Sequence, residues 1–279
     1  MNKKKESVST TRNIVKELSD LPTHLYRYSG ISGERLDWIR KVILESELYF
    51  PSPAKFNDPF DCKIPVNYRA TNLRARSYWT KVGKRENPGI SPQELTKAVK
   101  KLVHDSRTTE GKKEINKSLF QSLDENGIAS FTKAPTNMLM WSYYAEGHSG
   151  IALRFNMSLE NLVRIPNKTI PIQVNYSHEF PNLNFYQVDD DWNHFIATEI
   201  GTKSIEWEHE EEWRLISVNR TGYHQIPSEM LDGIILGKQI SKENERLIRE
   251  WAKEKGSDIE ILKVTHEEHS FDLKLIPLG

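Results

Sequence analysis

The sequence predicts an α+β fold: a central, mixed, mostly antiparallel β-sheet with flanking helices and a helical insertion. The second half of the chain contains seven short apolar stretches with strand character, at 128–132, 151–155, 172–176, 213–218, 233–236, 259–264 and 271–276. They do not alternate strictly with helices, and no dinucleotide-binding glycine motif follows any of them. These two observations favour an α+β fold over a doubly wound parallel one.

The first half of the chain adds a strand, a helix and a second strand. An aromatic strand candidate at 25–28 is followed by apolar residues at helical spacing between 36 and 44, and then by the apolar residues 48–50. The serine and proline at 91–92 form a typical helix start, and apolar residues at helical spacing continue from there. We therefore expect a helical insertion at about 91–126 that lies on the sheet.

The domain boundaries follow from the same pattern. Residues 1–22 are polar and end at a proline, which predicts an N-terminal arm outside the fold. Two more helices are expected in the second half, at about 192–200 and 241–256. No internal feature separates two units, so we expect a single α+β domain at 23–279.

Composition places the chain among ordinary globular proteins. It contains 39 Lys and Arg against 39 Asp and Glu, so no strong overall field attracts it to nucleic acid or to a membrane surface. Its single cysteine, Cys62, excludes an internal disulfide and a cysteine-rich zinc site, which suits a reducing compartment. No apolar run reaches the length of a signal sequence or a membrane span. We therefore expect a cytoplasmic protein without a membrane partner.

The densest chemical signal is an acidic run at 207–212 that leads into a strand candidate. Side chains alternate between the two faces of a strand, so Glu210, Glu212 and Arg214 are expected on one face. Neighbouring like charges repel. A chain accepts that repulsion on a solvated face, or where carboxylates and a cation are needed together in a cleft. The sequence leaves both interpretations open.

A second signal spans 138–153. One turn of helix there places Trp141 and Tyr144 on one side, either as part of the core or as the wall of an aromatic slot. Two glycines flank His148, so the backbone can approach a ligand closely or adopt positive φ angles. His148 itself is expected as a proton carrier or as a hydrogen-bonded structural residue.

Two stretches with loop character also carry patterns. Three prolines make 51–61 a rigid loop that contains Asn57-Asp58-Pro59-Phe60-Asp61. Between 67 and 89, six basic residues surround Tyr78 and Trp79. This composition is typical of a surface for single-stranded nucleic acid, and also of a solvated insertion.

Several linked motifs occur in order along the chain: Leu25-Tyr26-Arg27-Tyr28, Phe56-Asn57-Asp58-Pro59-Phe60-Asp61, Met140-Trp141-Ser142-Tyr143-Tyr144 with Gly150, then Lys203, Trp207, Glu210, Glu212, Trp213 and Arg214, and finally Gly237-Lys238. Together they resemble the bacterial domain-of-unknown-function family 2971. The resemblance runs from about Leu25 to about Lys238, and it implies no function.

A second resemblance is to the ADP-ribosyltransferase superfamily. Its arginine-type members carry an arginine on a first strand, Ser-x-Thr on a second and Glu-x-Glu on a later one. Arg27, Ser130-Phe131-Thr132 and Glu210-Glu211-Glu212 occur here in that order. The strand, helix and strand at the start of the chain also suit the superfamily's split sheet, provided that the helical insertion is looped out.

This resemblance implies an NAD-using enzyme that acts as a toxin or a phage-defence effector. Glu212 would stabilise the positive charge that develops on the ribose when nicotinamide leaves. Glu210 would orient or deprotonate the acceptor, and Arg27 would hold a phosphate or a ribose of NAD. We expect Arg27, Tyr144, Glu210 and Glu212 to converge on one pocket.

The other residues that the resemblance implies for NAD binding are Ser130, Trp141, Tyr144, His148, Lys203 and Arg214. One of the aromatic rings would stack on nicotinamide, and the serine would support the loop. The lysine and the arginine would either bind phosphate or pair with the glutamates. No metal is required for this chemistry, and the acceptor would be a protein or a nucleic acid.

Two other functions remain open. Asp58 and Asp61, together with Glu210, Glu212 and Lys203, are the residue types of a magnesium-dependent nuclease site. The two aspartates can equally cap a turn by accepting backbone N–H bonds. The third function is a non-catalytic sensor that binds a nucleotide or a protein in a defence system.

Overall fold

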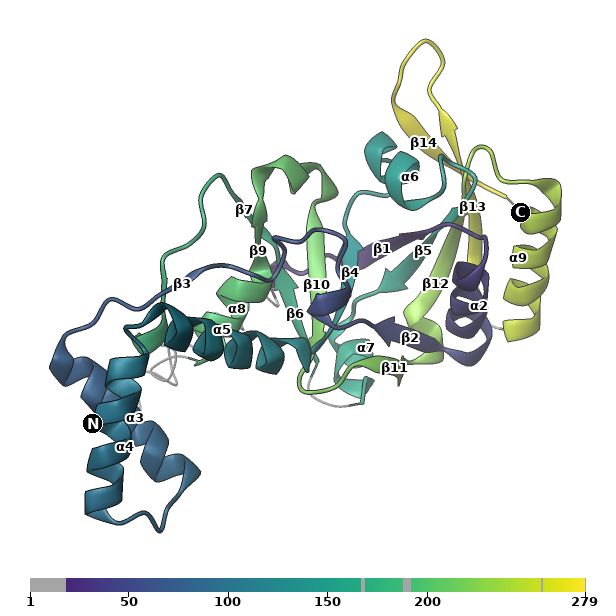
Figure 1. Ribbon diagram of the computed structural model, residues 1–279. Helices are drawn as coiled ribbons and strands as arrows, with labels where there is room; N and C mark the ends of the chain where they lie inside the picture. Colours follow the sequence, from purple (N-terminus) through teal and green to yellow (C-terminus); the bar gives the residue numbers. More distant parts are fainter. Residues whose placement is uncertain (1–18, 167–168, 188–191, 257, 279) are drawn as a thin grey trace.

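The computed structural model describes residues 19–278 except 167–168, 188–191 and 257, so most of the expected arm at 1–22 lies outside the described residues. Its centre is an eight-stranded sheet with the order β14-β13-β12-β5-β1-β4-β10-β6 (Figure 1). Only β12 and β13 are parallel, and the other neighbours in this sheet are antiparallel. The strands are β1 (His24–Ser29), β4 (Gly127–Thr132), β5 (Ile151–Asn156), β6 (Thr169–Gln173), β10 (Glu212–Ser217), β12 (Leu231–Leu236), β13 (Glu260–His266) and β14 (Leu273–Pro277). The expected mixed, mostly antiparallel α+β architecture is confirmed.

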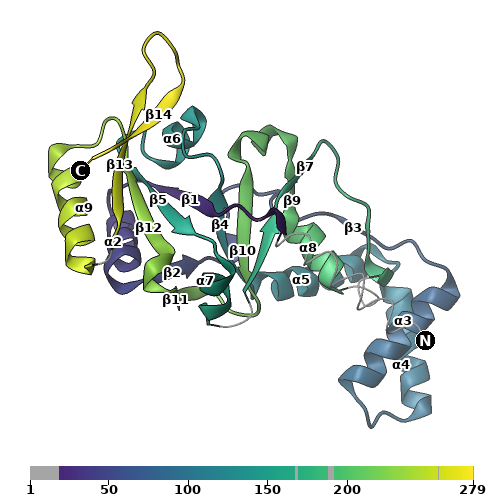
Figure 2. The same ribbon diagram turned by 180° about the vertical axis from the view of Figure 1, so that it is seen from behind.

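One face of the sheet carries the main core. It is covered by α2 (Glu34–Arg40), the π-helical turn Lys41–Glu45, α7 (Leu159–Arg164), α9 (Lys242–Lys255) and the ladder of β2 (Glu47–Phe50) with β11 (Gly222–Gln225). Figures 1 and 2 show α2 and α9 side by side at one end of the sheet. Alternate strand residues such as Leu25, Phe131 and Trp213 pack against apolar helix residues such as Ile39 and Ile248.

The opposite face is covered by two separate helices. Around α6 (Met138–Tyr144), Trp141 packs with Tyr28 of β1, and at the end of α8 (Trp192–Gly201), Ile200 packs with Ile216 of β10. These two apolar clusters share no residue. Polar side chains of β4 and β10 lie between them, which places the polar site on this face.

The sheet nearly separates between β1 and β4. β1 pairs with β5 along six residues, but its only pair with β4 is Tyr26 with Thr132. Further along, the N–H of Ile128 donates to the carbonyl of Pro51 at 2.8 Å. The two strands therefore diverge and leave space next to Tyr28 and Ser130.

A helical unit projects from the far end of the sheet (Figures 1 and 2). It consists of α3 (Asn72–Glu86), α4 (Pro92–Asp105) and α5 (Thr109–Asp124), with the short ladder of β3 (Val66–Asn67) and β8 (Leu183–Asn184) beside them. Its own apolar core includes Tyr78, Trp79, Val99, Leu123 and Phe185. The expected insertion at about 91–126 therefore begins earlier, at Asn72, and the expectation that it lies on the sheet is wrong for α3 and α4, which project from the end of the sheet. The helical spacing of Ala75, Tyr78, Trp79 and Val82 is hidden there among basic residues.

The other expected elements occur close to their predicted positions. The strand expected at 172–176 is interrupted at Val174, so its second part forms β7 (Asn175–Ser177), which pairs with β9 (Thr202–Ser204). Every helix in the described part of the chain is too short or too polar to cross a membrane.

Candidate functional site

A cavity of about 230 Å³ lies where β1 and β4 diverge. We call it the gap cavity. Its walls come from both strands, from α6, from the loop after β2 and from the start of β10. They are formed by Tyr26, Arg27, Tyr28, Pro51, Phe56, Asn57, Asp61, Ile128, Ser130, Phe131, Thr132, Met140, Tyr144, Lys203, Glu210 and Glu212.

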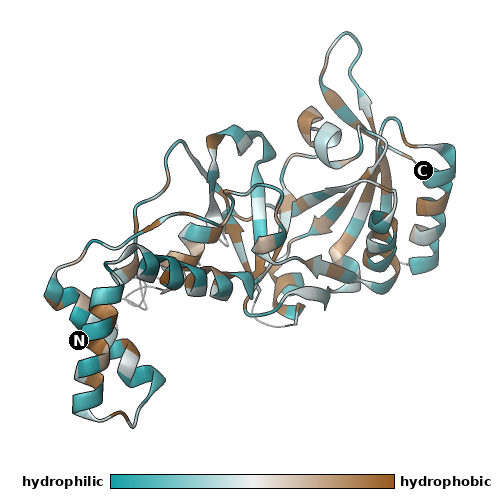
Figure 3. Ribbon diagram, in the orientation of Figure 1, coloured by the Kyte–Doolittle hydropathy of each residue, from teal (hydrophilic) through white to brown (hydrophobic). Residues whose placement is uncertain are grey.

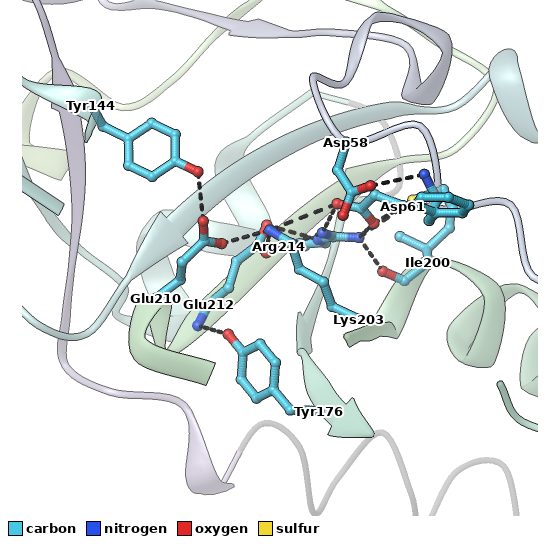
Figure 4. A network of polar contacts seen from close by, with 11 residues as sticks. Asp58, Asp61, Tyr144, Tyr176, Ile200, Lys203, Glu210, Glu212 and Arg214 are labelled. Carbon is cyan, nitrogen blue, oxygen red and sulfur yellow. Dashed lines mark hydrogen bonds and ion pairs between the residues drawn. The ribbon is translucent and has the colours of Figure 1, made fainter. Parts of the chain in front are cut away.

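One wall of the gap cavity is a buried ion network of Asp61, Lys203, Glu210, Glu212 and Arg214 (Figure 4). Arg214 is fully buried and uses all five of its N–H donors within the protein. Its guanidinium binds Asp61 through two hydrogen bonds of 2.9 and 2.7 Å, and Glu212 through two of 2.8 and 3.0 Å. The fifth N–H donates to the carbonyl of Ile200 at 2.5 Å. Arg214 therefore positions carboxylates and has no donor left for a phosphate.

Lys203 is the second cation of the network. Its Nζ lies 2.6 Å from Glu210 Oε2, 3.2 Å from Glu212 Oε2 and 3.8 Å from Asp61. Of the two alternatives for Lys203 and Arg214, the structure thus shows pairing with the glutamates. With three carboxylates and two cations, the ionised network has a net charge of −1. The surplus is negative and faces the cavity.

Glu210 reaches this position through a turn and not through a strand. It ends the 3₁₀ helix Ile205–Glu210, and Glu211 then adopts a left-handed conformation with φ 44°. β10 begins only at Glu212, so the expectation that Glu210 lies on the strand is wrong. The turn directs Glu211 outward to Lys133 at 2.8 Å, while its two neighbours point inward. Glu210 and Glu212 therefore both reach Lys203.

Tyr144 joins the network from α6. Its hydroxyl donates to Glu210 Oε1 at 2.6 Å. Burial, together with this hydrogen bond to Glu210, raises the pKa of Tyr144, so the phenol stays protonated. Ser130, on β4, also lines this cavity, and hydrogen bonding from its hydroxyl contributes to the lowered pKa of Glu212. The structure therefore brings Ser130, Tyr144, Glu210 and Glu212 together at one wall.

Glu212 is ionised at any physiological pH. Burial by itself raises the pKa of Glu212, but the positive charges of Arg214 and Lys203 outweigh burial and bring the pKa down to about 2. Burial lowers the pKa of Lys203, and Glu212 and Glu210 more than reverse that effect. A carboxyl group with so low a pKa is a weak proton acceptor but a permanent negative charge. The chemistry that suits it is electrostatic stabilisation of a cation.

Arg27 borders the gap cavity from the other face of the sheet. Alternation along β1 places it on the side of Leu25, and its guanidinium lies 4.8 Å above the ring of Trp38. One N–H donates to the carbonyl of Tyr49 at 3.3 Å. Arg27 forms no ion pair with any residue that the structure describes, and burial lowers its pKa to about 10. A charged donor without a described carboxylate partner thus borders the same cavity as the ion network.

Trp141 and His148 do not line the gap cavity. Trp141 is fully buried, contacts Tyr28 edge to face and donates its indole N–H to the carbonyl of Pro135. Of the two alternatives for Trp141, the structure thus shows a core residue. His148 lies behind it, with its ring 6.1 Å from that of Trp141. Burial and the nearby Lys238 lower the pKa of His148. Trp141 belongs to the apolar cluster around α6 and His148 follows that helix, so neither borders the gap cavity, and their part in cofactor binding stays a prediction.

The glycines around His148 serve the fold. His148 and the glycine before it have φ angles of 68° and 61°. A Cβ on Gly150 would lie 2.2 Å from the carbonyl oxygen of Ser29, and one on Gly237 would lie 2.2 Å from that of His148. The close backbone approach expected here therefore occurs between segments of the protein itself.

A second cavity of about 610 Å³ adjoins the first. We call it the outer cavity. It shares Asn57, Asp61 and Lys203 with the gap cavity, so the two cavities meet at the ion network. The remaining walls are Asp58, Pro59, Phe60, Ile64, Ser177, His178, Glu179, Phe180, Thr202, Ser204, Glu206 and Trp207.

The two aspartates of the rigid loop have different roles. Asp58 Oδ1 accepts the N–H of Phe60 at 2.9 Å, which is the capped turn that was one alternative. Asp61 instead binds Arg214. Within the described residues, no three His, Cys, Asp or Glu side chains are arranged to hold a metal ion.

Sequence reasoning missed two members of the site. Asp61 was expected as a metal ligand or as the cap of a turn, and not as the partner of a buried arginine. Tyr176 accepts the backbone N–H of Glu212 at 2.8 Å, and no local pattern around Tyr176 indicates that contact. Both lie far from Arg214 and Glu212 in sequence, so only the fold brings them there.

Comparison with known proteins gives one match. No curated protein and no solved structure matches the chain. Residues 140–215 match the model of a family described as a protein of unknown function, DUF2971. The matched segment contains Tyr144, Lys203, Glu210, Glu212 and Arg214, and therefore most of the ion network. The match confirms, over residues 140–215, the resemblance to this family that the ordered motifs indicate.

Proposed function

We propose that this protein is an ADP-ribosyltransferase-like enzyme that uses NAD. Its proposed biological role is that of a toxin or a phage-defence effector. The observation that carries the proposal is the polarity of the gap cavity. A network with a formal net charge of −1 forms one wall, and Arg27, which has no ion-pair partner among the described residues, borders the same cavity from the other face of the sheet. NAD is a ligand with matching polarity, because its nicotinamide ring is cationic and its pyrophosphate is anionic.

The order of the motif strands supports the same proposal. Arg27 is on β1, Ser130 on β4 and Glu212 on β10, and these three strands are consecutive neighbours in the sheet. Ser130 is paired directly with Arg214, two residues from Glu212. Residues from distant parts of the sequence thus border one cavity, as the resemblance to the superfamily requires.

The proposed reaction assigns charge stabilisation and proton transfer to two different residues. The bond between the ribose C1′ and nicotinamide breaks, and nicotinamide leaves as a neutral molecule with the electron pair. The positive charge left on the ribose is stabilised by Glu212, which is ionised throughout. The acceptor's nucleophile then bonds to C1′ and releases a proton, which Glu210 accepts as the proposed base. Tyr144 orients Glu210 through its hydroxyl.

The size of the two cavities fits a ligand that occupies more than one space. The gap cavity, at about 230 Å³, is smaller than the roughly 300–1,000 Å³ of typical small-molecule sites. It suits one end of a dinucleotide. The outer cavity, at about 610 Å³, lies across the shared wall and is open to the acceptor or to the rest of NAD.

The test is nicotinamide release from NAD by the purified protein, with and without magnesium. Wild type and Glu212→Gln are compared, and Glu211→Gln is the matched control. It removes the same charge one residue away, from a carboxylate that pairs with Lys133 outside the cavity. Loss of about 3 kcal/mol of transition-state stabilisation would slow Glu212→Gln roughly a hundredfold. Equal rates in the two variants, with both folded by circular dichroism, would refute the role of Glu212.

A non-catalytic nucleotide sensor is the second candidate. It is favoured by the saturation of Glu212, since both carboxylate oxygens already accept hydrogen bonds from Arg214 or Lys203. Calorimetric binding of NAD without nicotinamide release identifies this function. Cleavage of nucleic acid that requires magnesium would instead identify the nuclease.

A further inference from the structure

The helical unit is strongly basic although the whole chain is neutral. Residues 69–117 contain thirteen Lys and Arg but five Asp and Glu, a net charge of +8. Since the chain as a whole has 39 of each sign, the remainder carries −8. The charge is therefore separated between the projecting helices and the rest of the molecule. Figure 3 shows hydrophilic and apolar stretches in turn along the ribbon of these helices.

Most of these cations are exposed on the helices. The exposed Lys and Arg between residues 69 and 117 are Arg69, Arg76, Lys81, Lys84, Arg85, Lys97, Lys100, Lys101, Arg107, Lys113 and Lys117. On α4, Lys97, Lys100 and Lys101 share one face with His104, because residues three and four apart are neighbours on a helix. These three lysines form no ion pair with any residue that the structure describes. They present a rigid row of charge to solvent.

The apolar side chains of the unit are used in its own core. Val99 and Val103 of α4 and Leu119 of α5 are buried together. Tyr78 and Trp79 also lie in this core, so neither ring is available to stack on a base. Among the described residues from 69 to 124, Leu73 is the single large apolar side chain that is exposed.

We propose that the helical unit binds the phosphate backbone of double-stranded nucleic acid, independently of base sequence. A rigid row of unpaired lysines contacts successive phosphates and releases their counterions, which requires no apolar contact. Buried aromatic rings leave no stacking surface for single strands. The binding site is distinct from the gap cavity and does not depend on NAD.

An anionic membrane would need a different surface. A helix that lies in a membrane interface inserts an apolar face beside its basic one. Here the apolar faces of α4 and α5 are directed into the core, and among the described residues of 69–124 Leu73 is the large exposed apolar side chain. The observations therefore favour a polyanion that is bound through charge alone.

The experiment measures fluorescence anisotropy of a labelled 20-base-pair DNA duplex of arbitrary sequence against the full chain. The test variant is K97E/K100E/K101E on α4. The control is K242E/R246E/K253E, which makes the same change in charge at exposed positions of α9, a helix of equal length. We expect the dissociation constant of the test variant at 100 mM salt to rise at least about 10-fold, and that of the control less than about 2-fold.

Salt dependence gives a second measurement. The slope of log K against log salt should fall by about 1 for each lysine that contacts a phosphate. The neutral variant K97Q/K100Q/K101Q should show this reduced slope with an unchanged melting temperature, which separates lost binding from misfolding. Absence of duplex binding by wild type at 50 mM salt overturns the proposal. Equal weakening by the α9 control, or binding only to phosphatidylserine vesicles, also overturns it.

Discussion

Arg214 and Glu212 lie two residues apart on β10 and form a doubly hydrogen-bonded pair, with distances of 2.8 and 3.0 Å. Residues i and i+2 of a strand face the same way, so the sequence itself makes this contact available. Arg214 then binds Asp61 with its remaining edge. The pair thus connects the sheet to the loop after β2 and fixes the carboxylate that borders the cavity.

Arg214→Lys should destabilise the protein by about 3–5 kcal/mol, because one ammonium cannot replace five donors and leaves buried carboxylates without partners. Urea unfolding measures the difference. Arg220→Lys is the control, since Arg220 is exposed in the turn after β10, and it should change stability by less than about 0.5 kcal/mol. Equal midpoints for the two variants would show that Arg214 is not required for stability.

The fold was largely predictable because its strands are short apolar runs between turn residues. The stretches at 128–132 and 213–218 became β4 and β10, with shifts of a residue at their ends. Helix α3 was missed because Arg74, Arg76 and Lys81 interrupt its apolar positions. The order of strands in the sheet was not predictable, since it depends on contacts between distant residues.

The site was predictable in its residue types and less so in its geometry. Alternation along β10 correctly placed Glu212 and Arg214 on one face, but Glu210 joins them through the left-handed turn at Glu211. Alternation along β1 shows only that Arg27 shares a face with Leu25. Which face carries the site depends on how α6 and α8 cover the sheet.

Protonation of Glu212 in acid should lower the free energy of unfolding. Its folded-state pKa of about 2 is below the ordinary value of 4.5, so ionised Glu212 stabilises the fold above pH 4.5. This contribution, about 3 kcal/mol, is lost as the pH falls from 4.5 through 2. Urea unfolding at a series of pH values should show a smaller acid dependence for Glu212→Gln than for wild type. Parallel curves would contradict the assigned charge state.

Glu199 should have the opposite effect on stability, which it should lower as the pH rises. It is fully buried on α8, with Oε1 accepting the N–H of Ile64 at 2.7 Å, and burial raises its pKa to about 8. Between pH 4.5 and 8 the unfolded chain ionises Glu199 while the folded protein keeps it protonated. The fold therefore loses up to about 5 kcal/mol over this range.

Glu199→Gln removes this titration and can keep the hydrogen bond from Ile64. We expect its stability to equal that of wild type near pH 5 and to exceed it at pH 8. Glu208→Gln, at an exposed position, provides the comparison and should show no such divergence. If Glu199→Gln is no more stable than wild type at pH 8, Glu199 is ionised in the fold.

The substitution Tyr144→Phe distinguishes the contribution of the Tyr144 hydroxyl from that of its ring. The substitution keeps an aromatic surface at the cavity wall but removes the 2.6 Å hydrogen bond to Glu210. Stability should fall by only about 1 kcal/mol, because Tyr144 is partly exposed and Glu210 keeps its contact with Lys203.

The consequence for turnover depends on what Tyr144 does. If it orients Glu210 for the acceptor, kcat for ADP-ribosyl transfer should fall about tenfold, since a single positioned hydrogen bond contributes about 1.4 kcal/mol at that rate. The KM for NAD should stay the same if the ring alone contacts nicotinamide. Tyr143→Phe is the matched control, because Tyr143 is the adjacent residue of α6 and 62% exposed. A rise in KM with unchanged kcat would instead place the hydroxyl in NAD binding, and identical kinetics for both variants would remove Tyr144 from the mechanism.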